Sequence, residues 1–186
     1  GLLRAANQSP THRDFVSWLD EPSYVPGDRL LVKDDERIVA HVQVLHRAAM
    51  FGEVRVPIGS TQDLAVLPEL APLGYERMLL DAAEEAMGEN HAVVSITRTD
   101  RPEPYIEAGW TETDCRGYSR AGVGDLLAHL TAPSPPGHRR SRGLRIRLWR
   151  HVELDAVRAV YRSVTAEHWG ALFRSEPYWQ WLVGRR

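Results

Sequence analysis

The sequence predicts an α/β fold, with a mixed (α+β) sheet flanked by helices and a strand-helix-helix segment at the C-terminal end. Apolar runs at 30–32 and 38–44 are separated by the polar residues 33–37, as the two arms of a hairpin are. An amphipathic helix at 75–87 precedes a short apolar run at 92–96, which is typical of a strand-helix-strand unit. A hairpin that continues into such a unit predicts a central sheet with both antiparallel and parallel pairs.

The elements before the helix follow from turn residues and apolar runs. Residues 13–19 carry four apolar side chains and predict a short helix, which Pro22 ends because proline cannot continue the hydrogen-bond ladder. A turn is expected at 26–28, ahead of the hairpin. After the hairpin, residues 54–56 predict the start of a third strand and residues 64–67 belong to a fourth.

The helix at 75–87 has the clearest pattern in the chain. One side is apolar at helical spacing and the other is charged. Gly88 is the expected C-cap, because glycine adopts the left-handed conformation that ends many helices. The run at 92–96 is rich in β-branched residues and predicts a buried parallel strand.

The C-terminal third predicts a change of organisation. Residues 131–143 are rich in proline, arginine and glycine, which predicts a linker. Residues 144–148 alternate apolar and basic side chains as a strand does, and helices are expected at 154–164 and 178–182. The expected organisation is therefore a domain at 1–130, a linker at 131–143 and the start of a second, similar unit at 144–186.

A weak internal repeat supports a second unit. Ser9-Pro10 ahead of 15–19 resembles Ser175-Glu176-Pro177 ahead of 178–182, since each precedes an aromatic-x-x-Trp-Leu segment. Five aromatic residues near the end are too many to leave exposed: Trp169, Phe173, Tyr178, Trp179 and Trp181. We expect this segment to pack onto the first unit, in the same chain or in a partner chain, where it could supply the first strand that the unit lacks. The second arrangement would make a homo-oligomer through residues 144–186.

Composition narrows the class of protein. The chain has 186 residues and a formal net charge of -2, so its overall charge gives no reason to expect nucleic acid or an anionic membrane. Cys115 is the single cysteine, which excludes an intrachain disulfide and makes a reducing cytoplasm the expected location. No apolar run approaches the roughly 20 residues of a membrane span. The eight histidines show no metal-ligand spacing, so no metal site is expected.

Three motifs lie in the middle of the chain: an apolar run ending in Pro-Glu at 64–69, a helical segment at 79–84, and Tyr-Ile-Glu-Ala-Gly-Trp at 105–110. In this order they resemble the central strand, the first CoA-side helix and the Tyr-x-x-x-Gly-aromatic signature of the GNAT superfamily of acyl-CoA-dependent N-acyltransferases. The two-unit layout is similar to tandem GNAT proteins that modify aminoglycosides, which is an analogy of fold and sets no substrate.

The resemblance implies acetyl-CoA as co-substrate. The central strand would offer backbone groups to the pantetheine arm, and a turn at the next helix would hold the pyrophosphate. The implied CoA-binding residues are Leu64, Ala65, Val66, Leu73, Gly74, Tyr75 and Arg77.

The implied pyrophosphate loop departs from the family pattern of Arg/Gln-x-x-Gly-x-Gly/Ala. Only Gly74 matches it, because Ala71 lacks a basic or amide side chain and Pro72 has no N–H. Glu76 adds a negative charge where phosphates would sit, while Arg77 offers compensation if it reaches back. A missing charge-assisted hydrogen bond weakens binding by about 1.5–3 kcal/mol.

The resemblance also implies catalytic roles. Tyr105 is the expected acid for the CoA sulfur, and the alternative is an aromatic that packs the helix onto the sheet with its hydroxyl hydrogen-bonded. A backbone N–H of Leu64 or Val66 would stabilise the oxyanion. Where many family members carry a glutamate, this chain has Ser60 or its neighbours, so Asp63 is the nearest carboxylate base. The alternative also stays open: Asp63 is a solvated or capping residue, and the amine is deprotonated through water.

The sequence thus predicts an N-acetyltransferase that acts on a small-molecule amine or a protein amino group. The competing hypothesis is a non-catalytic GNAT-like binding or scaffold module with a degenerate phosphate loop. His41 and His46, on or beside a strand expected to line the substrate side, fit an ordinary structural role or a catalytic one. A basic stripe fits a solvated linker better than a nucleic-acid surface: Arg139, Arg140, Arg142, Arg145, Arg147 and Arg150.

Overall fold

The computed structural model describes residues 2–3, 11–113, 124, 128 and 150–184 of the chain. Residues Gly1–Glu112 and Ala159–Arg186 form one compact unit, and Thr113–Arg158 form another. The predicted linker and the strand predicted at 144–148 lie outside the described residues, so the predicted domain boundaries stay predictions. No helix in the described ranges is both long and apolar enough to cross a membrane.

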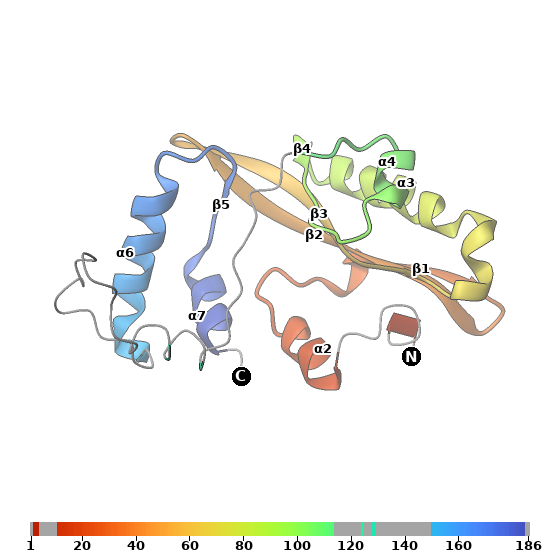
Figure 1. Ribbon diagram of the computed structural model, residues 1–186, viewed down its shortest axis with the longest axis horizontal. Helices are drawn as coiled ribbons and strands as arrows, with labels where there is room; N and C mark the ends of the chain where they lie inside the picture. Colours follow the sequence, from red (N-terminus) through yellow and green to blue (C-terminus); the bar gives the residue numbers. More distant parts are fainter. Residues whose placement is uncertain (1, 4–10, 114–123, 125–127, 129–149, 185–186) are drawn as a thin grey trace. The chain divides into compact units, whose positions relative to one another are not determined.

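The first unit is built on a five-stranded mixed sheet (Figure 1). Its order is β1-β2-β3-β4, and β5 pairs with β2. All pairs are antiparallel except that of β3 with β4. The strands are β1 Arg29–Asp34, β2 Arg37–Phe51, β3 Val54–Val66, β4 Val94–Ser95 and β5 Ala171–Leu172. The predicted mixed sheet is confirmed.

The long β2–β3 hairpin differs from the prediction. The prediction of separate third and fourth strands at 54–56 and 64–67 is wrong, because both belong to β3. The reason is that β2 continues past residue 44 to Phe51 and pairs with the polar middle of β3, from Phe51↔Val54 to Gln43↔Gln62. Pairing with β2 keeps these polar residues in a strand, although their own sequence pattern does not predict one.

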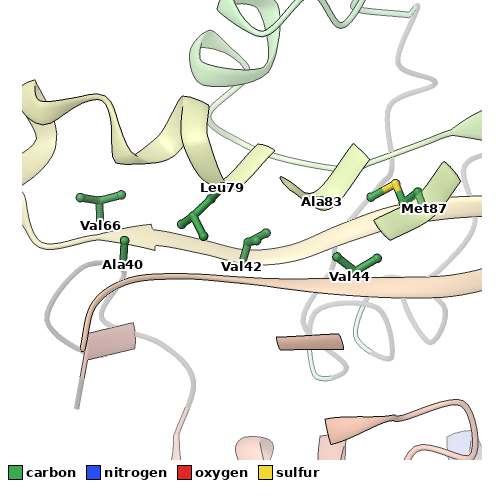
Figure 2. Packing of buried hydrophobic residues seen from close by; sticks show 7 residues of the cluster. All are labelled: Ala40, Val42, Val44, Val66, Leu79, Ala83 and Met87. Atoms are coloured by element: carbon green, nitrogen blue, oxygen red, sulfur yellow. The ribbon is translucent and has the colours of Figure 1, made fainter. Parts of the chain in front are cut away.

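The core lies between β2, β3 and the helix α3, Tyr75–Glu89 (Figure 2). Side chains alternate across a strand, so every second residue of β2 faces this helix. The core cluster contains Ala40, Val42, Val44, Val66, Leu79, Ala83 and Met87. Gly59 has no side chain here because a Cβ atom would overlap the Met87 side chain.

Two details around α3 correct the predictions. The helix continues through Gly88 to Glu89, and the left-handed conformation belongs to His91 (φ 61°) instead of the predicted C-cap. The predicted buried parallel strand at 92–96 is β4, which pairs with β3 through two residues only. Val93 and Ile96 beside it are 70% and 45% exposed, so this strand is not the buried one that its composition suggests.

The opposite face of the sheet meets both ends of the first unit. Arg47, on β2, donates to the carboxylate of Glu21 at 2.7 Å and to the hydroxyl of Tyr178 at 3.1 Å. Trp181 donates from Nε1 to the carbonyl of Ser17 at 2.8 Å. The Trp181 bond therefore joins helix α7 (Glu176–Gly184) to helix α2 (His12–Leu19). Arg47 joins β2 to α7 and to Glu21, which follows α2.

The C-terminal part of the first unit packs onto the sheet within the same chain. After η3 (His151–Glu153) and α6 (Leu154–Thr165), strand β5 pairs with β2 through Ala49↔Leu172 and Met50↔Ala171. The hydroxyl of Tyr161 donates to the carbonyl of Leu172 at 2.6 Å. The expected helices at 154–164 and 178–182 are confirmed. Residues from Ala159 onward belong to the first unit, although Trp169 and Phe173, which were expected to be buried, are 81% and 39% exposed. Packing of the whole segment 144–186 and the homo-oligomer stay predictions.

Candidate active site at the divergence of two parallel strands

The candidate site begins where β3 and β4 stop pairing. Their parallel register comprises Ile58↔Val94 and Gly59↔Ser95, followed by one bond from the N–H of Ile96 to the carbonyl of Gly59 at 2.9 Å. The next contact uses a side chain, since the N–H of Thr61 donates to Oγ1 of Thr97 at 2.9 Å. A hydroxyl has taken the place of a backbone carbonyl, which indicates that the two strands separate from this point.

A β-bulge lies two residues further along β3. The register with β2 shifts between His41 and Gln43, so Val42 faces both Asp63 and Leu64. Asp63 has a φ of 58°, a left-handed conformation that aspartate adopts more readily than most residues. After the bulge, Leu64 and Val66 pack towards the α3 core, and Ala65 faces the other side with His41. The bulge thus resets which residues of the predicted CoA-binding strand face each side.

A buried polar chain holds the bulge from the face opposite α3. Nη1 of Arg29 lies 3.0 Å from Nε2 of His41, and Nδ1 of His41 lies 3.0 Å from the carbonyl oxygen of Asp63. Arginine can only donate, so Nε2 must accept and Nδ1 must carry the proton. Burial lowers the pKa of His41, the bond to Asp63 opposes that effect, and the Arg29 charge adds to it. His41 is therefore held as the neutral imidazole. Of the two expected roles, this arrangement favours the structural one over the catalytic one.

The carboxyl group of Asp63 has an unsatisfied oxygen. Burial raises the pKa of Asp63, while Arg29 and a hydrogen bond with Gln62 lower it. Among the described residues no donor reaches its buried Oδ2, nor the buried Oε1 of Gln43. Gln43 is 2% exposed and lies between Arg29 and Gln62 on neighbouring strands. Buried acceptors of this kind bind donors when they can, so this part of the sheet suits an N–H or O–H group.

Tyr105 lies on the α3 side of the divergence, in the short helix α4 (Glu103–Glu107). Its hydroxyl is 2.9 Å from Oγ1 of Thr61, and its ring packs edge-on against Trp110 with centroids 5.4 Å apart. The N–H of Trp110 donates to the Tyr105 carbonyl, and Gly109 between them has a φ of 95°. The Tyr-x-x-x-Gly-Trp motif is thus a turn that folds an aromatic back against the tyrosine.

Several neighbouring groups act on the pKa of Tyr105. Burial raises the pKa of Tyr105, and the bond with Thr61 partly offsets this. Smaller effects come from Glu76 and Asp63, which raise it, and from Arg101, which lowers it. The predicted acid and the predicted base therefore lie close enough to act on each other's charge.

The predicted phosphate loop forms η2 (Pro68–Leu73) and ends at Gly74, whose φ of 76° precedes the first turn of α3. Arg77 donates to Asp81 at 2.8 Å and to the carbonyl of Glu107 at 2.9 Å, so its guanidinium is engaged with α3 and α4. Glu76 is paired with Arg101 at 3.0 Å. The cation that neutralises Glu76 at this helix end is therefore Arg101, from the segment between β4 and α4.

Several of these residues had no sequence signal. The sequence gives Thr61 no role beyond its place next to Ser60, and Thr97 and Arg101 follow β4 in a segment without regular structure. Arg29 and Gln43 sit in ordinary strands. Their roles come from cross-strand neighbours, which a single sequence does not reveal.

Comparison with known proteins identifies the fold. The sequence profile of the family described as "Acetyltransferase (GNAT) domain" matches residues 3–113. A search of curated proteins finds no match. Among solved structures, a putative acetyltransferase from Agrobacterium tumefaciens superposes with a TM-score of 0.51 at 14% identity, covering 64% of this chain and 89% of that one.

A second solved structure extends over the whole chain. It is a conserved protein of unknown function from Enterococcus faecalis, titled a probable N-acyltransferase, with a TM-score of 0.62 and 18% identity. It covers 99% of this chain, which spans only 45% of that protein. A glucosamine-6-phosphate N-acetyltransferase from Arabidopsis thaliana has a TM-score of 0.50 at 13% identity, over 64% of this chain and 86% of its own. The similarity to solved structures concerns the fold, and the family profile covers more than half of the sequence: the chain belongs to the GNAT family of acetyltransferases.

Proposed function

We propose that the protein is an N-acetyltransferase that moves an acetyl group from acetyl-CoA to an amine. The observation that carries the proposal is that Tyr105 is hydrogen-bonded to Thr61 at the divergence of β3 and β4, while Asp63 lies two residues further along β3. Tyr105 lies on the α3 side, where the CoA arm would lie, and Asp63 lies at the bulge, near the unsatisfied acceptor oxygen of Gln43. A candidate acid and a candidate base thus belong to one short stretch of this strand and its neighbours.

The chemistry assigns one task to each group. The neutral amine attacks the thioester carbonyl, a C–N bond forms and the C–S bond breaks. The phenol of Tyr105 gives its proton to the departing thiolate, and the carboxylate of Asp63 takes a proton from the amine nitrogen, directly or through water. A base works best with a pKa near the working pH, so the raised pKa of Asp63 suits this task. Solvent then returns the proton from Asp63 to Tyr105.

CoA binding would use the groups that precede α3. The predicted residues are the strand Leu64–Val66 for the pantetheine arm and the turn Leu73–Tyr75 with Arg77 for the pyrophosphate. Arg101 adds a cation beside this helix end, and it would exchange its bond to Glu76 for one to a phosphate. A helix N-terminus favours anions, which supports the same placement.

The acceptor is proposed from the opposite face. The unsatisfied oxygens of Gln43 and Asp63 favour an acceptor that brings several N–H or O–H donors. Both a small polar amine and the amino group of a protein chain satisfy this chemistry.

The second candidate function is a non-catalytic binding module. The loop sequence favours it, because Ala71 and Pro72 supply neither a basic side chain nor a second N–H, and Glu76 is acidic. Nucleic-acid binding is not proposed, since all but Arg150 of the basic stripe lies outside the described residues.

Calorimetric titration with acetyl-CoA, followed by an assay of free thiol release, separates the two functions. The amine panel should include an amino sugar, a polyamine and a lysine-containing peptide. The enzyme is supported by micromolar binding with amine-dependent thiol release that Asp63→Asn and Tyr105→Phe both reduce. No heat at millimolar acetyl-CoA supports the module, whose loop lacks these phosphate contacts, and binding without release from any amine contradicts the enzyme.

A further inference from the structure

A chain of three hydroxyl groups ends at Tyr105. Oγ1 of Thr97 lies 2.7 Å from Oγ1 of Thr61, which lies 2.9 Å from the hydroxyl of Tyr105. Thr97 also accepts from the N–H of Thr61 and lies 3.2 Å from the Thr61 carbonyl. Thr61 and Tyr105 are only 5% and 7% exposed, so water has little access to this chain.

The protons in this chain can be arranged in two ways, because each hydroxyl has one proton and two lone pairs. In the first arrangement Thr97 donates to the Thr61 carbonyl, Thr61 donates to Thr97, and Tyr105 donates to Thr61. Every proton then has an acceptor within the chain, and the phenolic proton is not available. This is the arrangement expected without substrate.

In the second arrangement the two bonds between hydroxyl groups are reversed, and Thr97 gives up its bond to the Thr61 carbonyl. Thr97 donates to Thr61, Thr61 donates to the phenolic oxygen, and the proton of Tyr105 is left for a further acceptor. A thiolate beside Tyr105 supplies that acceptor. As the proton leaves, negative charge develops on the phenolic oxygen, where the Thr61 hydroxyl already donates.

We propose that Thr61 is a positioning residue that stabilises the Tyr105 phenolate during acyl transfer, and that Thr97 fixes the Thr61 hydroxyl for this task. The proposal rests on the proposed function, in which Tyr105 protonates the leaving thiolate. Thr61 makes and breaks no covalent bond, and its proton moves only by rotation. Ser60, whose hydroxyl is 3.4 Å from Thr97, makes the longest contact of the group.

Three charged residues also act on the pKa of Tyr105, and the proposed role of Thr61 does not change their effects. Glu76 on α3, Arg101 ahead of α4 and Asp63 on β3 all face it, and the first and last raise its pKa while Arg101 lowers it. The Thr61 bond is the largest effect that favours the phenolate. Among the described groups that act on Tyr105, Thr61 therefore contributes most to releasing the proton.

The test is a double-mutant cycle in kcat. Thr61→Val removes the hydroxyl while keeping the shape of the side chain, and we expect kcat to fall about tenfold to a hundredfold with little change in the KM for acetyl-CoA, as for the loss of a hydrogen bond to a charged oxygen. Thr61→Ser should restore most of the rate. In a Tyr105→Phe background, Thr61→Val should have no further effect, because its role passes through the phenol.

Two further measurements exclude a merely structural role. With acetyl-seleno-CoA, whose selenolate leaves without a proton, the Thr61→Val defect should nearly disappear. Ser95→Ala is the matched control, since that hydroxyl contacts the sulfur of Met87 and not the chain, and it should keep the wild-type kcat. An equal defect with both esters, or additive losses with Tyr105→Phe, overturns the proposal.

Failure of this proposal is distinguishable from failure of the proposed function. An active wild type with additive variants overturns the role of Thr61 alone. If the wild type transfers no acetyl group, the proposed function fails, and tyrosine ionisation still tests the hydrogen bond. Magnetic resonance of labelled tyrosine rings, with the Tyr105 signal assigned from Tyr105→Phe, should show a higher pKa in Thr61→Val; an unchanged pKa overturns the proposal.

Discussion

The two faces of strand β2 place different demands on the same backbone. Towards α3, alternate residues are Ala40, Val42 and Val44, which pack without needing partners. On the other face, His41 and Arg47 each make two side-chain hydrogen bonds: His41 accepts from Arg29 and donates to the Asp63 carbonyl, and Arg47 donates to Glu21 and Tyr178. An apolar face is stabilised by area and fit, whereas a polar face is stabilised only while every partner is present. Substitutions should therefore fail differently on the two faces.

The largest effect is expected on the apolar face. Leu79→Ala removes a side chain that is 3% exposed, and the cavity should lower the free energy of unfolding by about 2–5 kcal/mol. Met78→Ala, one position away and 56% exposed, should change it by less than about 0.5 kcal/mol. Urea unfolding of both variants measures the contrast. Similar losses of unfolding free energy in the two variants would show that burial does not determine how much a side chain of α3 contributes to stability.

The next effect tests dependence on partners. Arg47→Met leaves the carboxylate of Glu21 without its cation in a nearly buried site, which should lower stability by about 3 kcal/mol. Adding Glu21→Gln should recover much of the loss, because it removes the buried charge and keeps an oxygen that can accept from Ser23. The matched exposed pair is Arg37 with Glu69, where Arg37→Met should cost about 0–1 kcal/mol. If the double variant is worse than Arg47→Met alone, the polar face does not behave as a set of mutual partners.

A third prediction sharpens the contrast by testing the exposed ion pair between Arg101 and Glu76. Arg101→Gln should leave the unfolding midpoint almost unchanged, because the pair with Glu76 is solvent-accessible. It should nevertheless weaken acetyl-CoA binding by about 1.5–3 kcal/mol, roughly ten- to a hundredfold, if Arg101 reaches the phosphates. Calorimetry on Arg101→Gln and on the exposed control Arg55→Gln tests this. Equal affinity of the two variants for acetyl-CoA would mean that Arg101 does not contact the phosphates.

The smallest effect is a pH dependence that belongs to the polar face. The pKa of His41 is lowered in the folded protein, so the unfolded chain binds its proton first as pH falls. The stability contributed by neutral His41 is complete above its unfolded pKa and is lost as pH falls through the folded value. Stability should decline by at most about 1.4 kcal/mol per pH unit below about pH 6.5 for this one group.

The control for this prediction is His41→Gln, whose amide can donate and accept but does not titrate in this range. Its unfolding free energy should fall less steeply between pH 7 and pH 5 than that of the wild type. Parallel curves would mean that the pKa of His41 is the same in the folded and the unfolded chain, which contradicts a neutral imidazole held by burial and Arg29.

How far the sequence predicted this structure depends on the range of the signal. The α3 helix followed from its own periodicity, and the Tyr105–Trp110 motif marked the turn that positions the candidate acid. The middle of β3 was not predicted, because residues 59–63 are held by β2 and not by a pattern of their own. The bulge at Asp63 depends on a two-against-one pairing with Val42, and Thr97 acquires its role only where β4 stops pairing. Local periodicity specifies helices; a site built from cross-strand neighbours is visible only in three dimensions.

Strand β2 accepts partners from opposite ends of the chain along one edge, with β1 near its start and β5 near its finish. Arg47 and Tyr178 are 131 positions apart, so this edge is completed only after a very large loop has closed. Doubling the length of such a loop adds only about 0.6 kcal/mol to its closure, so the separation affects the rate of folding more than the final stability. During synthesis, residues 171–172 must leave the ribosome before this edge can be finished, and until then β2 presents open backbone groups on which a chaperone or a second nascent chain can act.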